Sequence, residues 1–232
     1  MSHTIQVPSS LAEITVNKYQ DFVKRSKGVE GDALDVLTVS IFCDIETEAV
    51  NYMSASDVIS ISKMINALFT MDQELIRTTK IEGVKIGLVP ELDKLTFGEY
   101  IDLDENINDW EKIHIALSVL YRPITKQVGD RYSIQSYRGE DYELSEDNPS
   151  YIECMKLLTM DVALGAVVFF YALGKELLET TRVYLVEQLQ NQITQNGRNS
   201  LSSGDGIHQS INYLTDLLAD SMTPLKPIFT KH

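Results

Sequence analysis

The segment 102–108 places oxygen-bearing side chains at every second position, a pattern that could bind a calcium ion. The residues are Asp102, Asp104, Asn106 and Asn108. An EF-hand loop also needs a glycine at its sixth position and a bidentate glutamate at its twelfth. Ile107 and Ile113 stand there instead. We therefore interpret the segment as an acidic helix face and expect no metal.

A second pattern with possible metal chemistry is Glu111-x-x-His114. Helical di-iron sites use this spacing, but they need two such motifs and two further inward glutamates. The chain holds one motif. His114 lies on an otherwise apolar helix face, so we expect a core histidine with its hydrogen bonds satisfied rather than a ligand.

Other catalytic signatures are missing from the sequence. It has no Gly-x-Ser-x-Gly nucleophile elbow and no Gly-x-x-x-x-Gly-Lys-Ser/Thr phosphate loop. The four histidines and two cysteines do not have zinc-site spacing. We expect a non-enzymatic protein with no cofactor, although a carboxylate enzyme leaves no sequence signature and stays an alternative.

Tyrosines flanked by charges and glycines form a candidate protein-binding site. Tyr132, Tyr137 and Tyr142 fall in a glycine-containing excursion, and Tyr151 follows it. Exposed tyrosines bring a large contact area at low entropy cost. Partial burial against their own domain is the alternative.

The charge balance limits the partners. The net charge is −14, and the stretch 91–161 holds 16 acidic and 7 basic residues. Such a surface repels phosphate, so we expect no direct nucleic-acid binding. The charge serves either solubility or the binding of a basic partner.

Hydrophobicity and cysteine content indicate the compartment. The most apolar run, Val162–Leu173, has 12 residues, and a membrane span needs about 20. No apolar signal segment follows Met1. Cys43 and Cys154 are too few for a disulfide framework, so we expect a soluble protein with buried thiols in a reducing compartment.

Helical periodicity dominates the first 72 residues. Apolar residues at helical spacing predict helices over 14–27, with Thr15 or Asn17 as its cap, over 32–43, and from about Ser56 to Phe69. These helices should form a small bundle.

Strand and helix signals alternate after Asp72. Two β-prone runs, 75–81 and 84–89, flank Glu82-Gly83 and predict a hairpin that Pro90 ends. Thr96 and Glu99 match a capping box for a helix to about Asn106. A helix is expected over 110–121, capped by Asn108 or Asp109 and ended by Pro123. A loose hairpin or long excursion should follow over 124–146. A short helix should then start at Asn148-Pro149, and a long helix should run over 159–192.

The C-terminal segment predicts a separate docking element. Residues 194–206 read as a flexible linker. Beyond them one helical stripe carries Ile207, Ile211, Leu214 and Leu218. A helix this short is unstable alone in water, so it should dock on its own domain or on a neighbour.

The predicted fold is therefore mainly α (α+β), with groups of packed helices and one or two small β-hairpins. Its expected regions are an N-terminal helical region (1–72), a hairpin plus acidic helical core (73–193), a linker (194–206), and a docking helix with its tail (207–232).

Parts of the chain also resemble a known group of proteins. The relevant stretches lie in 81–124, with Glu82-Gly83, Leu88-Val89-Pro90-Glu91-Leu92, Leu95–Asp102, Trp110 and Leu117–Ile124, and in Met160–Ala166. Together they are similar to small virion-associated proteins of crAss-like and related tailed phages, over about residues 11–178.

This resemblance implies a non-enzymatic phage component, and it carries over no catalytic residue. One form is a cargo protein packed in the head and tail and ejected with or before the DNA. Its partners would then be portal, ring or tail proteins, or its own copies in a symmetric ring. It would reside in the virion, and in the host cytoplasm during assembly. The alternatives are a tail-assembly chaperone absent from the particle and a host-directed effector with an unmarked active site.

Overall fold

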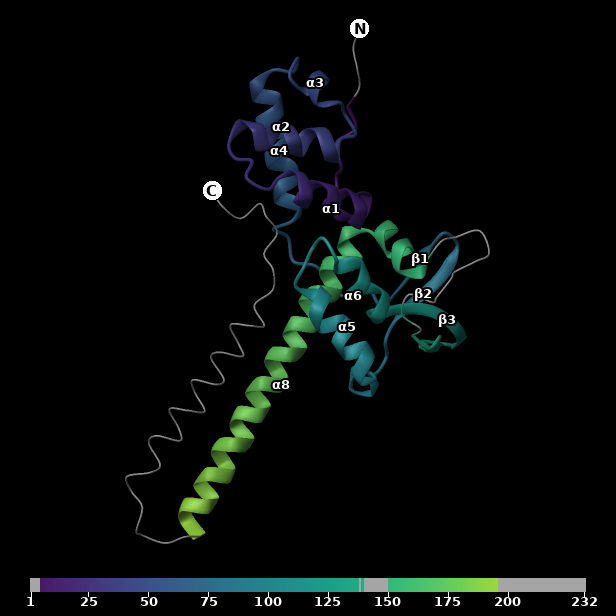
Figure 1. The fold of residues 1–232 in the computed structure, drawn as a ribbon, viewed down its shortest axis with the longest axis vertical. Coiled ribbons are helices and arrows are strands. Elements are labelled where there is room, and N and C mark those ends of the chain that lie inside the picture. Colours follow the sequence, from purple (N-terminus) through teal and green to yellow (C-terminus); the bar gives the residue numbers. More distant parts are fainter. Residues whose placement is uncertain (1–4, 138, 140–149, 196–232) are drawn as a thin grey trace. The chain divides into compact units, whose positions relative to one another are not determined.

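The computed structural model describes residues 5–137, 139 and 150–195. Most of them are helical, and a small four-stranded antiparallel sheet accompanies the helices (Figure 1). The prediction of a mainly helical α+β fold with small hairpins is thus confirmed. The described residues fall in two compact units, one that reaches Ala166 and one that starts at Val167.

The chain begins the first unit with short helical elements. They are η1 (Leu11–Glu13), α1 (Val16–Arg25), α2 (Asp32–Phe42), α3 (Thr47–Val50) and α4 (Ala55–Leu68). Thr15 caps α1 as predicted, because its side chain accepts the amide of Lys18. The cap of α4 is Ser54, whose side chain accepts the amide of Asp57, so this helix starts slightly before the expected Ser56.

Helices α2 and α4 pack against each other and run in the same direction. Ser62 Oγ donates to Asp35 Oδ1 at 2.5 Å, and the rings of Phe42 and Phe69 lie 5.8 Å apart. Both contacts join residues 27 positions apart. The first turns of the two helices therefore lie side by side.

An aromatic cluster forms the core beneath these helices. The ring of Tyr19 lies 5.1 Å from that of Phe69 and 5.1 Å from that of Trp110, and Phe22 lies 5.2 Å from Phe42. All five side chains are buried. Burial of these aromatic side chains contributes strongly to the stability of the fold. Their contacts join α1, α2 and the end of α4 to the turn at Trp110.

The sheet joins two hairpins that the sequence predicts separately. Its strands follow the order β1 (Thr78–Ile81), β2 (Val84–Leu88), β3 (Tyr121–Val128) and β4 (Arg131–Ile134). Glu82 and Gly83 both have positive φ, as a tight two-residue hairpin requires. Leu88 pairs with Tyr121 across β2 and β3, which makes one sheet of the two hairpins.

Two helices lie between β2 and β3 in the chain, after the short turn η2 (Leu92–Lys94). Helix α5 (Phe97–Ile107) starts with the predicted capping box of Thr96 and Glu99. Helix α6 (Ile113–Leu120) starts later than predicted, because residues 110–112 form a turn. The helix ends at Leu120, within one residue of the predicted end at Tyr121, and Pro123 lies within the strand β3 that follows at once.

The last helices close the first unit. After Ser150 the chain forms α7 (Tyr151–Cys154), η4 (Met155–Leu157) and α8 (Met160–Gln195). The amide of Met160 donates to Ile14 O at 2.8 Å, so the start of α8 pairs with the chain just before α1. The predicted helix start at Asn148-Pro149 and the excursion beyond 139 lie outside the described residues.

The second unit contains α8 from Val167 to Gln195. Val183 and Tyr184 are exposed along it. Among the described residues no helix combines the length and the hydrophobicity needed to cross a bilayer.

Candidate functional site

A hollow with both polar and apolar walls lies between α5 and the loop that follows β4. We call it the Arg122 cavity. It has a volume of about 590 Å³, and its walls combine apolar with charged side chains. Its lining includes Val89, Leu95, Glu99, Asp102, Arg122 and Tyr137. Convergent polar groups in an apolar hollow are typical of a small-molecule site.

Arg122 is the central charge of this cavity. Its side chain is 8% exposed, and Nη1 lies 2.7 Å from Glu99 Oε1. Its Nε donates to Val119 O at 2.9 Å. Nη2 is buried and has no hydrogen-bond partner among the described residues. A buried guanidinium N–H without an acceptor is costly, so a bound acceptor would stabilise this group.

Glu99 holds both the helix and the arginine. Its Oε2 accepts the amide of Thr96 at 2.6 Å, while its Oε1 faces Arg122. The capping box therefore fixes the carboxylate that neutralises the buried cation. Sequence spacing predicted the cap but not the ion pair.

Tyr137 covers the other side of Arg122. The guanidinium carbon lies 5.5 Å from the ring centroid, a cation–π distance. The hydroxyl donates to Asp102 Oδ2 at 2.9 Å. Burial, reinforced by the carboxylate of Asp102, raises the pKa of Tyr137 to about 12. The phenol thus stays protonated at neutral pH and acts as a donor, not as a base.

The predicted interface tyrosines are engaged inside the first unit. Tyr132 donates its hydroxyl to Leu88 O at 2.7 Å. A Cβ on Gly87 would lie 2.5 Å from the Tyr132 ring, so this glycine makes room for it. Tyr151 is buried and donates to Tyr121 O. The interface role of Tyr132 and Tyr137 stays a prediction, and Tyr142 lies outside the described residues.

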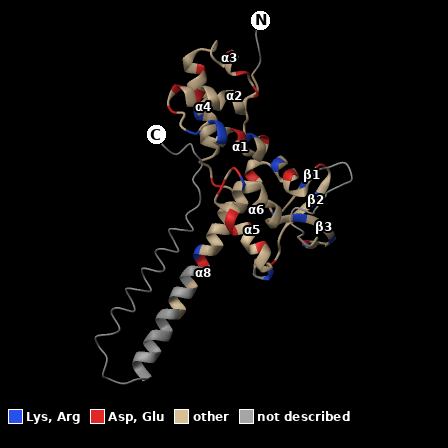
Figure 2. Ribbon diagram, in the orientation of Figure 1, with Lys and Arg blue, Asp and Glu red and all other residues tan. Residues whose placement is uncertain are grey.

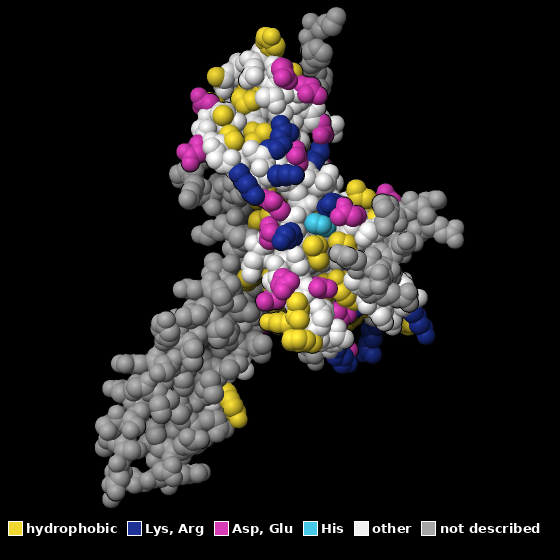
Figure 3. Space-filling model, in the orientation of Figure 1, with side chains coloured by type: hydrophobic (Ala, Val, Ile, Leu, Met, Phe, Trp, Pro, Cys, Tyr) yellow, Lys and Arg dark blue, Asp and Glu magenta, His cyan; other side chains and the backbone are white. Residues whose placement is uncertain are grey.

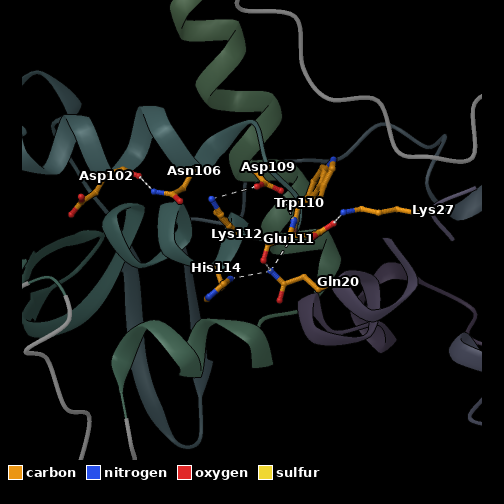
Figure 4. Close-up of polar contacts among 9 residues, drawn as sticks. All are labelled: Gln20, Lys27, Asp102, Asn106, Asp109, Trp110, Glu111, Lys112 and His114. Atoms are coloured by element: carbon orange, nitrogen blue, oxygen red, sulfur yellow. Dashed lines mark hydrogen bonds and ion pairs between the residues drawn. The ribbon is translucent and has the colours of Figure 1, made fainter. Parts of the chain in front are cut away.

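The two suspected metal patterns form no metal site in the described chain. Asp102, Asp104 and Asn106 lie on α5, and Asn106 Nδ2 donates to Asp102 O at 2.7 Å within it. The side chain of Glu111 points to Lys27 and forms an ion pair with it (Figure 4). Over the described residues no group of three metal-ligating side chains could hold a metal ion.

His114 is a core histidine, as its sequence context indicates. Gln20 Nε2 lies 3.0 Å from His114 Nδ1 and contacts the carbonyls of Trp110 and Glu111 (Figure 4). An amide nitrogen can only donate, so this contact is a hydrogen bond when Nδ1 carries no proton. Burial is the main cause that lowers the pKa of His114.

The cysteines are also buried, as predicted. Burial raises the pKa of Cys43 to about 11 and raises that of Cys154. Neither thiol is therefore suited to nucleophilic chemistry at neutral pH.

A second surface feature lies on the N-terminal helices. Two adjoining hollows, of about 690 and 210 Å³, share the lining residues Asp32, Val36 and Asn51. We call them together the N-terminal groove. Apolar side chains dominate its floor: Val29, Ala33, Val36, Leu37, Val50, Met53, Val58 and Ile59. Figure 3 shows hydrophobic side chains gathered over these helices, with both acidic and basic side chains around them.

The groove arises at the first half of α2. The helix carries Asp32 and Asp35 in its first turn and is mainly apolar beyond it. Its second half is buried in the aromatic core, but Asp32 and Ala33 in its first turn are exposed. The parallel first turns of α2 and α4 therefore leave an apolar surface uncovered. Sequence analysis found the helix and missed this uncovered half.

The predicted C-terminal docking stripe, Ile207, Ile211, Leu214 and Leu218, lies outside the described residues, as does the linker before it. No protein-family model matches the chain, and neither a characterised protein nor a solved structure is significantly similar to it.

Proposed function

We propose that this protein acts through protein–protein contacts, as a component of a tailed-phage particle packed in the head or tail. The N-terminal groove carries the proposal. It is an apolar surface that the described part of the chain leaves uncovered, between two well-packed helices. Soluble proteins rarely keep contiguous apolar surface exposed unless it binds something.

The phage context comes from the resemblance over 81–124 and 160–166. Physical properties are compatible with it. A protein enclosed with packaged DNA should not bind its phosphates, and a net charge of −14 opposes such binding. A tail-assembly chaperone would use the same kind of groove, but it would leave before the particle is complete.

Quantitative mass spectrometry of purified, nuclease-treated particles tests this proposal. We expect several copies per particle, at a constant ratio to the portal protein. Abundance in the infected-cell lysate combined with absence from the particle would favour the chaperone. Absence from both would contradict a particle role.

A second candidate function is that of a host-directed effector with a ligand site, and the Arg122 cavity favours it. A hollow of about 590 Å³ with a buried guanidinium N–H that has no partner in the described chain fits a small ligand that presents a hydrogen-bond acceptor. The groups around it are suited to binding more than to proton transfer. Burial and the carboxylate of Asp102 raise the pKa of Tyr137, so its phenol stays protonated.

A further inference from the structure

We infer that the N-terminal groove receives one amphipathic helix of a partner protein, with lysines and arginines beside its apolar face. The inference rests on the proposed function, that the protein works through protein contacts, and it specifies the partner's chemistry. Three observations carry it: the charge around the groove, the elements that form its floor, and the net negative charge of the chain itself.

The residues around the groove are mainly acidic, although Arg25 lines the larger hollow and Lys63 follows the lining residue Ile59 by one turn of α4. Residues 28–62 contain seven Asp and Glu residues and no Lys or Arg. Figure 2 shows acidic positions across α2, α3 and their connecting segments. Asp32 lines both hollows, and the exposed Glu30 and Glu48 each follow a lining residue, Val29 and Thr47. A complementary partner is therefore basic at its edges.

Two features make the electrostatic potential around the groove less negative, but they do not make it positive. The first turns of α2 and α4 each contribute about half a positive charge from the helix dipole. Arg25 lines the larger hollow, but its guanidinium already pairs with Asp21 at 3.2 Å. Four carboxylates at the groove outnumber these contributions: Asp32 and Asp35 line the hollows, and Glu30 and Glu48 lie beside lining residues.

The floor of the groove favours a helix over an extended peptide. Its apolar residues lie mainly on α2 and α4, whose backbone groups are used within the helices. An extended peptide on this floor would bury backbone N–H and C=O groups without partners. A helix satisfies its own backbone and can place side chains at i, i+3 and i+4 against the floor.

A second copy of the chain is a poor occupant. Each copy carries a net charge of −14, so two copies repel each other. Three cations near the groove are also in ion pairs, Lys18 with Asp44, Arg25 with Asp21 and Lys27 with Glu111. The chain's own segment 207–218 is also unsuitable by charge, because it contains Asp216 and no Lys or Arg. The partner is therefore a different, basic protein.

Binding of synthetic helices to the full-length protein tests the inference. The probe is a fluorescein-labelled peptide of about 18 residues, or five turns, made of leucine and lysine in an amphipathic pattern. Its twin carries glutamate in place of lysine. We expect micromolar binding of the Leu/Lys peptide by fluorescence anisotropy, weakened when NaCl rises from roughly 0.05 M to roughly 0.5 M. The Leu/Glu twin should not bind.

Matched variants show whether the peptide uses the groove. Glu30→Lys with Glu48→Lys should weaken binding at least about tenfold, equivalent to about 1.4 kcal/mol. Asp104→Lys with Glu105→Lys, at exposed positions of α5, makes the same change in net charge and should have little effect. Ile59→Asn in the groove should weaken binding, whereas Ile101→Asn on α5 should not. Circular dichroism checks that every variant is folded.

The outcomes separate this inference from the proposed function. Equal effects of the two charge pairs, or equal binding of the Leu/Glu twin, would overturn the basic-helix inference. So would a wild-type protein that does not bind the Leu/Lys peptide. Such results leave the particle role intact if mass spectrometry finds the protein in particles. Groove-specific peptide binding by a protein absent from particles and lysate complexes would instead reject the proposed function.

Discussion

Arg122 and Glu99 form a buried ion pair, in which Nη1 of the arginine lies 2.7 Å from Oε1 of the glutamate. Their side chains are 8% and 10% exposed. The pair joins the first residues of β3 to the first turn of α5 and leaves Arg122 Nη2 at the cavity without a partner in the described chain. Burial makes each charge dependent on the other.

Glu99→Gln should destabilise the protein by about 3 kcal/mol, because it leaves a buried, unpaired guanidinium. The glutamine keeps an oxygen that can accept the Thr96 amide, so the capping interaction is retained. The double variant Glu99→Gln with Arg122→Met should be more stable than the single one, since no buried charge remains. Urea denaturation measures both. Additive losses in the double variant would show that the charge is not the cause.

Tyr137 should make stability depend on alkaline pH. Its folded-state pKa of about 12 exceeds the ordinary value of 10.0, so its contribution is complete below pH 10 and is lost as the pH rises through 12. Tyr137→Phe removes this titration. Its stability should therefore fall less steeply above pH 10 than that of the wild type in urea titrations. Parallel curves for the two proteins would contradict the assignment.

His114 should make the stability of the protein depend on pH in the acidic range. Burial lowers its folded-state pKa below 6.5, so its contribution is present above pH 6.5 and is lost as the pH falls. His114→Gln should flatten the stability profile between about pH 7 and pH 5, where histidine ordinarily titrates. Thermal unfolding across this range tests the effect. An unchanged slope in the variant would assign the pH dependence to other groups.

Two helical glycines should respond oppositely to alanine. A Cβ on Gly165 would lie 2.5 Å from Glu74 O, whereas one on Gly98 would meet nothing within 4 Å. Gly165→Ala should destabilise by about 1–3 kcal/mol through overpacking. Gly98→Ala should stabilise by up to about 1 kcal/mol through helix propensity. Denaturation midpoints of the two variants on the same side of the wild type would contradict the close packing at Gly165.

Features that depend on neighbouring residues could be predicted from the sequence. The capping box of Thr96 and Glu99, the cap at Thr15 and the turn at Glu82-Gly83 are all present as expected. Each is fixed by residues within one turn of chain, where local hydrogen bonds and φ preferences decide the conformation. The long helix predicted over 159–192 is also present, as α8 over Met160–Gln195.

Features that join distant segments could not be predicted. Leu88 pairs with Tyr121, and Arg122 meets Glu99, only because the chain returns after α5 and α6. Pro123 illustrates the difficulty: it suggested the end of a helix, yet it lies in β3, opposite Ile86. One signal was available, since a charged Arg122 beside buried residues requires a partner.

The uncovered first half of α2 also could not be predicted from the sequence. Helical spacing places Leu34, Leu37, Ile41 and Phe42 on one shared face, which predicts burial of that face. The exposed start of this helix depends on the parallel arrangement of α2 and α4, which periodicity does not specify. A functional surface of this kind is visible only after the packing is known.

Site-specific photocrosslinking during phage assembly tests the central claim most directly. A benzoylphenylalanine at Ile59, in the N-terminal groove, is compared with one at Ile101 on α5, because the two isoleucines are 38% and 37% exposed. We predict one dominant adduct from position 59, with a basic helical segment of a particle protein, and no such adduct from position 101. Identical adducts from both positions, or none from position 59, would contradict a contact function of the groove.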